Sequence, residues 1–432
     1  MKFPAYSSYK PSGVEWLGEI PAGWVSKRLS YLALLKSGEN ITSDELEDGG
    51  VYPVFGGNGI RGYSSRFTHS GNYVLIGRQG ALCGNINYAD GRFWASEHAI
   101  VASPLCKFPT SWLGELLRAM NLNQYSVSAA QPGLAVQMIC GLKIPVPPLP
   151  DQVAIAAFVE SQAGKIGHLM GRQQELIERL KEKRTALISR AVTRGLPPAA
   201  SRSAGLPERP ALKRSGLDWL GDIPTHWGLA ELRRFTRFIT SGSRGWAEYY
   251  SDEGSIFVRI GNLTRHSIVV DLSDVQYVDP PLSAEGQRTR IRLGDMLVSI
   301  TAYLGSVAVA SEPVLGAYIN QHIALVRVDQ TRLDPRFAAY SILGDVGRVQ
   351  LTGLGYGGTK IQLSLDDVKS LRLCVPPLRE QEAIALYLDE ETAKLDRLVA
   401  KVEKAIERLQ EYRTALITAA VTGKIDVRGA VA

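Results

Sequence analysis

The stretch VPPLPDQVAIAAFV, from Val146 to Val159, returns as VPPLREQEAIALYL from Val375 to Leu388. Paired prolines disfavour helix in the residues before them, and the acidic residue that follows each pair suits the first turn of a helix, where the dipole favours an anion. No proline interrupts residues 151–195 or 380–432. Each copy of the stretch therefore predicts the start of a long helix.

An apolar stripe follows along both predicted helices, with the mixed 3- and 4-residue spacing of a coiled-coil seam. Its members, 229 residues apart in the two copies, are Ile166, Leu169, Gln173, Leu176, Leu180, Lys183 and Leu187, and Leu395, Leu398, Val402, Ala405, Leu409, Tyr412 and Leu416. A helix over residues 151–193 would be about 60 Å long and could not leave such a stripe in water. We expect the two helices to pair antiparallel. The alternative is that each helix packs on its own globular domain.

A second repeat lies upstream of each helix. KPSGVEWLGEIPAGW at Lys10–Trp24 matches KRSGLDWLGDIPTHW at Lys213–Trp227. The chain is thus two copies of one unit of about 210 residues, each with a matched start, a matched end and a divergent middle. The middles are faintly related, since GNYVLIGRQGALCGNI resembles GDMLVSITAYLGSVAV and His98 falls beside His322.

Short runs rich in β-branched residues, and two segments with helical spacing, predict mixed α and β structure in each middle. The fold class is therefore α/β (α+β): two tandem mixed domains joined by two long antiparallel coiled-coil helices, with pseudo-two-fold symmetry. The expected divisions are residues 1–150 (first domain), 151–195 (first helix), 196–212 (Pro-rich linker), 213–378 (second domain), 379–424 (second helix) and 425–432 (tail).

Composition narrows the class of protein. With 45% apolar and 21% charged residues among 432, the chain suits a folded protein and excludes wholesale disorder. No apolar run reaches about 18 residues, no secretion signal is apparent, and the four cysteines form no CxxC pair. We therefore expect a cytoplasmic chain without a disulfide framework or zinc site. The net charge of +6 favours a polyanion partner, nucleic acid first.

Catalytic motifs are missing. The sequence has neither a GxxxxGK[ST] phosphate loop nor a GxGxxG stretch after a strand. His98 and His322 lack metal-ligand spacing and a nucleophile nearby, so we interpret them as structural. The sequence thus predicts a chain that is not an enzyme and binds neither a cofactor nor a metal.

Glycine-flanked loops that carry Arg, Lys, Asn and Gln are the places where DNA base edges could be read. The candidate residues are Asn58, Arg61, Arg66, Arg78, Gln79, Gln131, Arg244, Arg259, Asn262, Arg265, Thr301, Tyr303, Tyr356 and Lys360. Arg78 and Gln79 follow an apolar run and precede Gly80, so we expect them at a rigid strand tip. The competing hypothesis is a scaffold with two protein-binding modules on a coiled-coil spacer.

The duplicated domain followed by a VPPL-x-acidic-Gln helix, with the RTALI ends at Arg184 and Arg413, resembles the specificity subunit of type I restriction–modification systems. The resemblance covers nearly the whole chain. It implies that each middle is a target recognition domain reading one half of a bipartite double-stranded DNA site. It also implies that the helices dock two modification (methyltransferase) subunits, which restriction subunits join.

In such a complex, S-adenosylmethionine, ATP and Mg belong to the partner subunits. The docking candidates that follow from the repeated ends are Arg184, Thr185, Leu187, Arg413, Thr414 and Leu416. A DNA reader of a methylation-only defence complex is an alternative within the same family. One departure is Pro150, where the second copy has Arg379, and we expect it to delay the start of the first helix by a turn.

Overall fold

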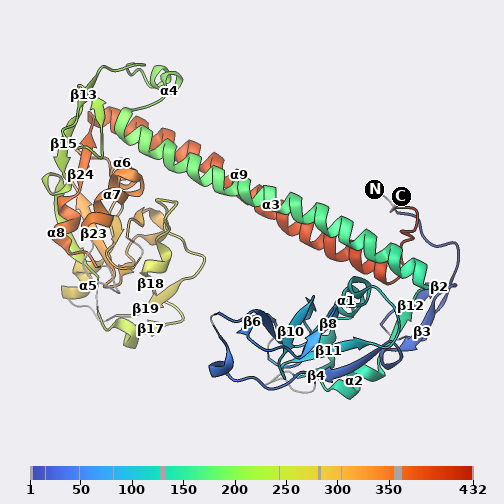
Figure 1. Cartoon of the computed structure of the whole chain (residues 1–432). Coiled ribbons are helices and arrows are strands. Elements are labelled where there is room, and N and C mark those ends of the chain that lie inside the picture. Colours follow the sequence, from blue (N-terminus) through green and yellow to red (C-terminus); the bar gives the residue numbers. More distant parts are fainter. Residues whose placement is uncertain are drawn as a thin grey trace. The chain divides into compact units, whose positions relative to one another are not determined.

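The computed structural model describes residues 3–14, 16–47, 49–80, 82–126, 133–242, 244–280, 284–302, 304–354 and 362–430 (Figure 1). Four candidate residues, Gln131, Tyr303, Tyr356 and Lys360, lie outside this description. The chain divides into two compact units, Met1–Gln174 with Glu403–Ala432, and Glu175–Val402. Each unit holds one globular domain and a portion of each long helix.

The first domain is built on two four-stranded sheets. One is antiparallel, in the order β4 (Ala33–Ser37), β11 (Ala99–Pro104), β8 (Tyr73–Gly77), β9 (Ile86–Ala89). The other has the order β6 (Gly59–Ser64), β5 (Tyr52–Gly56), β10 (Arg92–Ala95), β7 (His69–Ser70), with β5 and β10 parallel. Consecutive apolar residues in β8 and β11 are buried because both faces of that sheet are covered.

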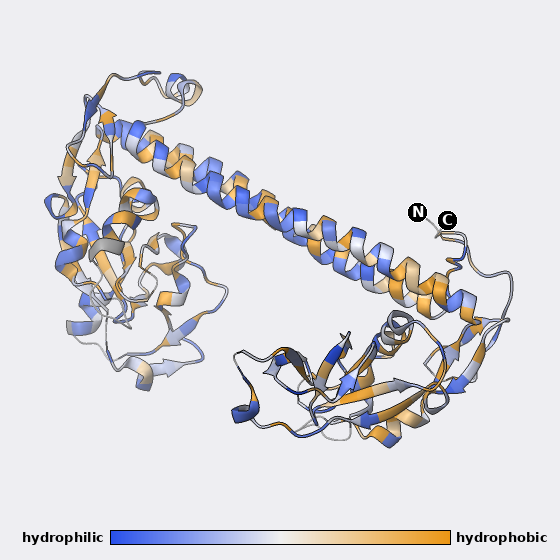
Figure 2. Cartoon of the chain, in the orientation of Figure 1, coloured by the Kyte–Doolittle hydropathy of each residue, from blue (hydrophilic) through white to orange (hydrophobic). Residues whose placement is uncertain are grey.

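The second domain repeats the antiparallel sheet and three strands of the mixed sheet, but its fourth mixed-sheet strand, β17, lies at the opposite edge from β7. Its antiparallel sheet has the order β16 (Thr236–Ser241), β23 (Ile323–Val328), β20 (Met296–Ser299), β21 (Val307–Val309). Its mixed sheet has the order β17 (Tyr250–Ser251), β19 (Gln276–Val278), β18 (Ser255–Val258), β22 (Tyr318–Ile319), with β18 and β22 parallel. The faint likeness of the two middles therefore reflects one duplicated fold, with apolar residues concentrated in the strands of both (Figure 2).

A two-stranded ribbon closes each domain and leads into a long helix. In the first unit β3 (Val25–Arg28) pairs with β12 (Lys143–Val146) ahead of α3 (Leu149–Arg194). In the second β15 (Gly228–Glu231) pairs with β24 (Arg372–Val375) ahead of α9 (Leu378–Val421). The repeated starts form the small hairpin-like pairs β1 (Tyr9–Pro11) with β2 (Glu19–Pro21) and β13 (Leu212–Arg214) with β14 (Asp222–Pro224).

Shorter helices complete the units. They are α1 (Thr110–Ala119), α2 (Val136–Gly141), α5 (Ala284–Thr289), α6 (Pro335–Leu343), α7 (Asp345–Leu354), α8 (Leu365–Ser370) and, within the Pro-rich linker, α4 (Pro198–Ser203). The expectation for Pro150 was wrong, since α3 begins at Leu149 and includes it. Proline is tolerated in the first turn because its missing N–H would have had no intrahelical partner.

The long helices pair antiparallel in each unit. In the first, Ile155 and Ile166 of α3 share one core with Leu416 and Ile417 near the end of α9. In the second, residues near the end of α3 share a core with Ile384 and Leu388 near the start of α9. The same cores contain residues of the globular domains, so helix pairing and packing on the domains occur together. The antiparallel prediction is thereby confirmed, and its alternative also holds in part.

The predicted seam was wrong at alternate positions. Leu169, Leu176, Leu398 and Tyr412 are 43%, 42%, 46% and 48% exposed. The stripe that is buried or half-buried instead consists of Ile166, Met170, Gln173, Ile177, Leu180, Arg184 and Leu187, and of Leu395, Val399, Val402, Ile406, Leu409 and Leu416. The remaining equivalent position, Arg413, is exposed. Both registers share four of seven positions in each helix. In the second copy Arg413 gives the true register one apolar residue fewer than the predicted one, so a count of apolar side chains favours the wrong register.

Candidate nucleic-acid interface

A rigid strand tip follows β8 in the first domain. The Arg78 N–H donates to the carbonyl of His98 at 2.8 Å, and the Arg78 carbonyl accepts from the Leu134 N–H at 2.9 Å. The next residue, Gln79, forms a β-bridge with Gly133. Backbone hydrogen bonds on both sides thus hold residues 78 and 79 extended, as predicted for a tip that presents side chains.

The second domain has the same tip. The Ile300 N–H donates to the carbonyl of His322 at 3.0 Å, and the Ile300 carbonyl accepts from Leu363 at 2.9 Å. Thr301 forms the bridge to Gln362 that Gln79 forms to Gly133. Gln79 and Thr301 are therefore equivalent. The sequence match had set Arg78 beside Thr301, one residue out of register with these hydrogen bonds.

An open hollow of about 510 Å³ lies beside the first tip. It brings together three candidates that are separate in sequence: Asn58 and Arg61 from the β5–β6 hairpin, and Gln79. The hairpin approaches the tip closely, since a Cβ on Gly77 would lie 2.3 Å from the carbonyl oxygen of Gly57. Only glycine fits at residue 77, so the local sequence is what creates this approach.

His98 lines the hollow too and contacts Gln79. Its Nδ1 lies 3.0 Å from Gln79 Oε1, and its Nε2 lies 3.0 Å from a carboxylate oxygen of Glu97. The sequence marked His98 only as structural. Its contact with Gln79 depends on the geometry of the strand tip, and no local sequence pattern predicts that geometry.

Other arginine candidates of the first domain are placed differently. Arg66 pairs with Glu45 at 3.1 Å, and its guanidinium lies 5.3 Å from the centre of the Trp94 ring. Arg78 is half-buried and does not line the hollow. The structure thus separates Arg78 from Asn58, Arg61 and Gln79.

The described candidates of the second domain are placed individually. Arg259 pairs with Asp274 at 2.8 Å, while Arg244 and Arg265 are exposed and Thr301 is half-buried. Asn262 requires a correction because it is only 5% exposed. Its Nδ2 donates to the carbonyls of Asp271 and Asp274, and its Oδ1 accepts from the Arg259 N–H. Its amide holds a loop together and has no donor left for a base.

The docking candidates also divide. Arg184 is buried and paired with Asp396, whereas the equivalent Arg413 is exposed. Thr185 and Thr414 donate to carbonyls of their own helices, at 3.2 Å from Lys181 and 3.0 Å from Gln410.

Leu416 is buried in the core and offers no surface, whereas Leu187 is half-buried. The feature that the sequence prediction missed is the equivalent pair Leu169 and Leu398, exposed at the same position of the two helices.

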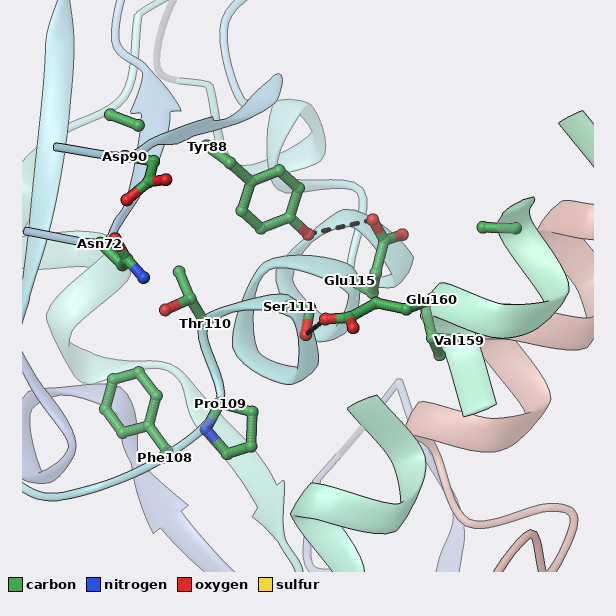
Figure 3. A pocket seen from close by; sticks show the side chains of 12 residues that line it. Asn72, Tyr88, Asp90, Phe108, Pro109, Thr110, Ser111, Glu115, Val159 and Glu160 are labelled. Carbon is green, nitrogen blue, oxygen red and sulfur yellow. Dashed lines mark hydrogen bonds between the residues drawn. The ribbon is translucent and has the colours of Figure 1, made fainter. Parts of the chain in front are cut away.

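Each unit also has a hollow where its long helix meets its domain. In the first, of about 680 Å³, the Tyr88 hydroxyl donates to Glu115 at 3.0 Å and Ser111 donates to Glu160 of α3 at 2.8 Å (Figure 3). In the second, of about 500 Å³, Tyr340 donates to Asp389 of α9 at 2.8 Å.

Glu160 and Asp389 are equivalent, 229 residues apart, and no sequence argument singled them out. Burial raises the pKa of Tyr340, so its hydroxyl remains a donor to Asp389. Both acids thus tie a long helix to its own domain.

Within the described residues, no group of three or more His, Cys, Asp or Glu side chains could hold a metal ion. No helix among them is long and apolar enough to cross a membrane.

Comparisons with known proteins agree on one family. The sequence profile of the type I restriction modification DNA specificity domain matches residues 21–179 and 283–408. The chain is 44% identical over 138 residues to the EcoprrI specificity subunit of Escherichia coli, covering 31% of this chain and 34% of that one. It is 20% identical over 428 residues to the MjaVIII specificity subunit of Methanocaldococcus jannaschii, covering 95% and 94%.

A solved structure from a study of type I R-M complex assembly and conformational transition has the same fold. It matches with a TM-score of 0.65 and 19% identity, over 93% of this chain and 98% of that one. The duplicated domains, the two long helices and the profile that matches each copy lead to one conclusion. The chain belongs to the type I restriction–modification DNA specificity family.

Proposed function

We propose that this chain is the sequence-specific DNA-binding subunit of a type I restriction–modification complex, with each domain reading one half of an asymmetric bipartite site. The observation that carries the proposal is the pair of equivalent strand tips with unlike residues, Gln79 in one domain and Thr301 in the other. Two copies of one scaffold that present different side chains suit two different half-sites, since base edges are distinguished by side-chain donors and acceptors.

The experiment is a titration of labelled duplex DNA with the full chain at several salt concentrations. Specific DNA binding should weaken steeply as salt rises, because lysine and arginine contacts release counterions from the duplex. Methylation mapping in the host should then give a motif with two unlike halves. If the chain showed neither salt-dependent nor sequence-selective binding to duplex DNA, the result would instead support the protein-binding scaffold.

The helices are the proposed docking sites for two copies of one modification subunit. An identical partner needs two equivalent surfaces, and Leu169 and Leu398 supply exposed apolar side chains at equivalent positions. Methyl transfer and DNA cleavage, with S-adenosylmethionine, ATP and Mg, are assigned in this proposal to the modification and restriction partners.

A further inference from the structure

The hollow beside the first strand tip contains a chain of three polar side chains, Gln79, His98 and Glu97. An amide oxygen only accepts hydrogen bonds, so the 3.0 Å contact between Nδ1 of His98 and Oε1 of Gln79 assigns a proton to Nδ1. On the other side of the ring, Nε2 lies 3.0 Å from a carboxylate oxygen of Glu97, which forms an ion pair with the ring when both nitrogens carry protons. With its oxygen held by His98, the Gln79 amide has its NH₂ group available to donate.

That direction has a consequence for reading DNA. An amide that offers NH₂ complements the acceptors of the major groove, which are N7 and O6 of guanine, N7 of adenine and O4 of thymine. The reversed amide would offer an acceptor to the amino group of adenine or cytosine. A glutamine free to take both directions discriminates poorly between these edges.

Resting on the proposed function, we propose that Gln79 reads a base edge in the first half-site and that His98, oriented by Glu97, is the positioning residue that fixes the direction of its amide. The hollow gives the base edge room, and Arg61 from the facing hairpin offers further donors to it. The absence of side chains at Gly57 and Gly77 allows the hairpin to lie directly against the tip.

The second domain provides a natural comparison. His322 occupies the place of His98, but Gln321 replaces Glu97 and Thr301 replaces Gln79. The Nε2 atom of His322 lies 3.2 Å from Gln321 Nε2, and among the described residues no hydrogen bond joins His322 to Thr301. The described part of the second domain thus has the equivalent histidine, but neither the neighbouring carboxylate nor the hydrogen bond to the strand tip. His322 is therefore a matched control.

The test uses the full-length chain, purified with its companion subunits, and selection from a library of duplexes randomised within both half-sites. Preferred duplexes and their single-base variants are then titrated. Gln79→Ala should reduce discrimination at one base pair of the first half-site about tenfold or more. His98→Phe, which keeps the ring and removes both nitrogens, should reduce discrimination at the same base pair while overall affinity changes less.

Because His98 acts through Gln79, the double variant should discriminate no worse than Gln79→Ala alone. Glu97→Gln should give a smaller loss at the same base pair. His322→Phe should leave both half-sites unchanged.

The inference is overturned if His98→Phe keeps the full base preference, or if the double variant loses much more than Gln79→Ala. A uniform loss of affinity for all duplexes would equally overturn it, since it would mark a structural role. These outcomes differ from failure of the proposed function, in which the unaltered chain itself selects no sequence from the library.

Discussion

Arg78 lies next to Gln79 on the first strand tip, but its side chain is placed differently. Its backbone is fixed by His98 and Leu134, but its side chain does not line the hollow that Gln79 enters. We predict that Arg78→Ala relaxes recognition at one base pair of the first half-site and leaves the other half-site intact. Titrations of single-base variants at two salt concentrations decide. A uniform loss with a salt slope lower by about one unit would mark a phosphate contact instead.

The cysteines predict a pattern of chemical reactivity. All four are free, and burial raises the pKa of the Cys374 thiol to about 12. Because the thiolate is the nucleophile, Cys374 should resist iodoacetamide at pH 8 while exposed Cys106 is alkylated. Peptide mass spectrometry of the folded chain measures both rates. Equal labelling before unfolding would contradict the prediction, and denatured protein provides the control.

At the residue scale, the sequence predicted which residues could contact DNA better than it predicted where their side chains lie. It selected Asn58, Arg61 and Gln79 from glycine-rich loops, and the structure brings them together. It could not predict that the side-chain amide of Asn262 makes three hydrogen bonds within its own loop. The residues flanking an asparagine in a loop do not indicate whether its side chain is exposed or buried. Nor could it find Glu97 and His98 as partners of Gln79, since that contact depends on strand register.

At the scale of the element, the two long helices are similar in sequence but differ in their ion pairs. Arg184 is buried against Asp396, whereas the position equivalent to Asp396 in the first copy is Gly167, and Arg413 is exposed. We predict that Arg184→Ala lowers the free energy of unfolding by about 1–3 kcal/mol, because it leaves Asp396 without its partner. Arg413→Ala should change the free energy of unfolding by no more than about 0.5 kcal/mol.

Hydrogen–deuterium exchange of the peptide spanning residues 388–402 reports the first change, and that of residues 155–170 reports its matched control. Similar loss of protection in both variants would contradict this asymmetry.

The exposed leucines carry the docking prediction. Leu169→Asp and Leu398→Asp should each remove one copy of the modification subunit, because each introduces a charge into an apolar contact without disturbing the buried seam. Native mass spectrometry of the reconstituted complex counts the copies. Full assembly after both changes would refute docking at these positions, and Leu176→Asp, an exposed leucine with no leucine at its counterpart, serves as control.

The sequence predicted the helices themselves well, because proline pairs and uninterrupted apolar periodicity are local signals. It failed on which residues of the stripe turn inward. Leu169 and Met170 are both apolar, and only the facing helix and the domain core decide which one is buried.

For the whole molecule, duplication implies that each half of recognition is separable. The two domains share one antiparallel sheet topology and have different tips, so exchanging Val25–Lys143 for the corresponding segment of another family member should alter one half-site only. Methylation mapping before and after the exchange measures the outcome. A change in both half-sites would show that the domains do not read independently.

The ribbons that close the domains have an evolutionary consequence. Val25 pairs with Val146 and Gly228 pairs with Val375, so the chain enters and leaves each domain at adjacent residues of one antiparallel pair. A foreign insert with the same two end strands meets the same neighbours. The repeated coding stretches on either side also provide homology for crossover between related genes, or between the two halves of one gene. Under the proposed function, one recombination event would thereby replace the specificity for one half-site and leave the rest of the assembly unchanged.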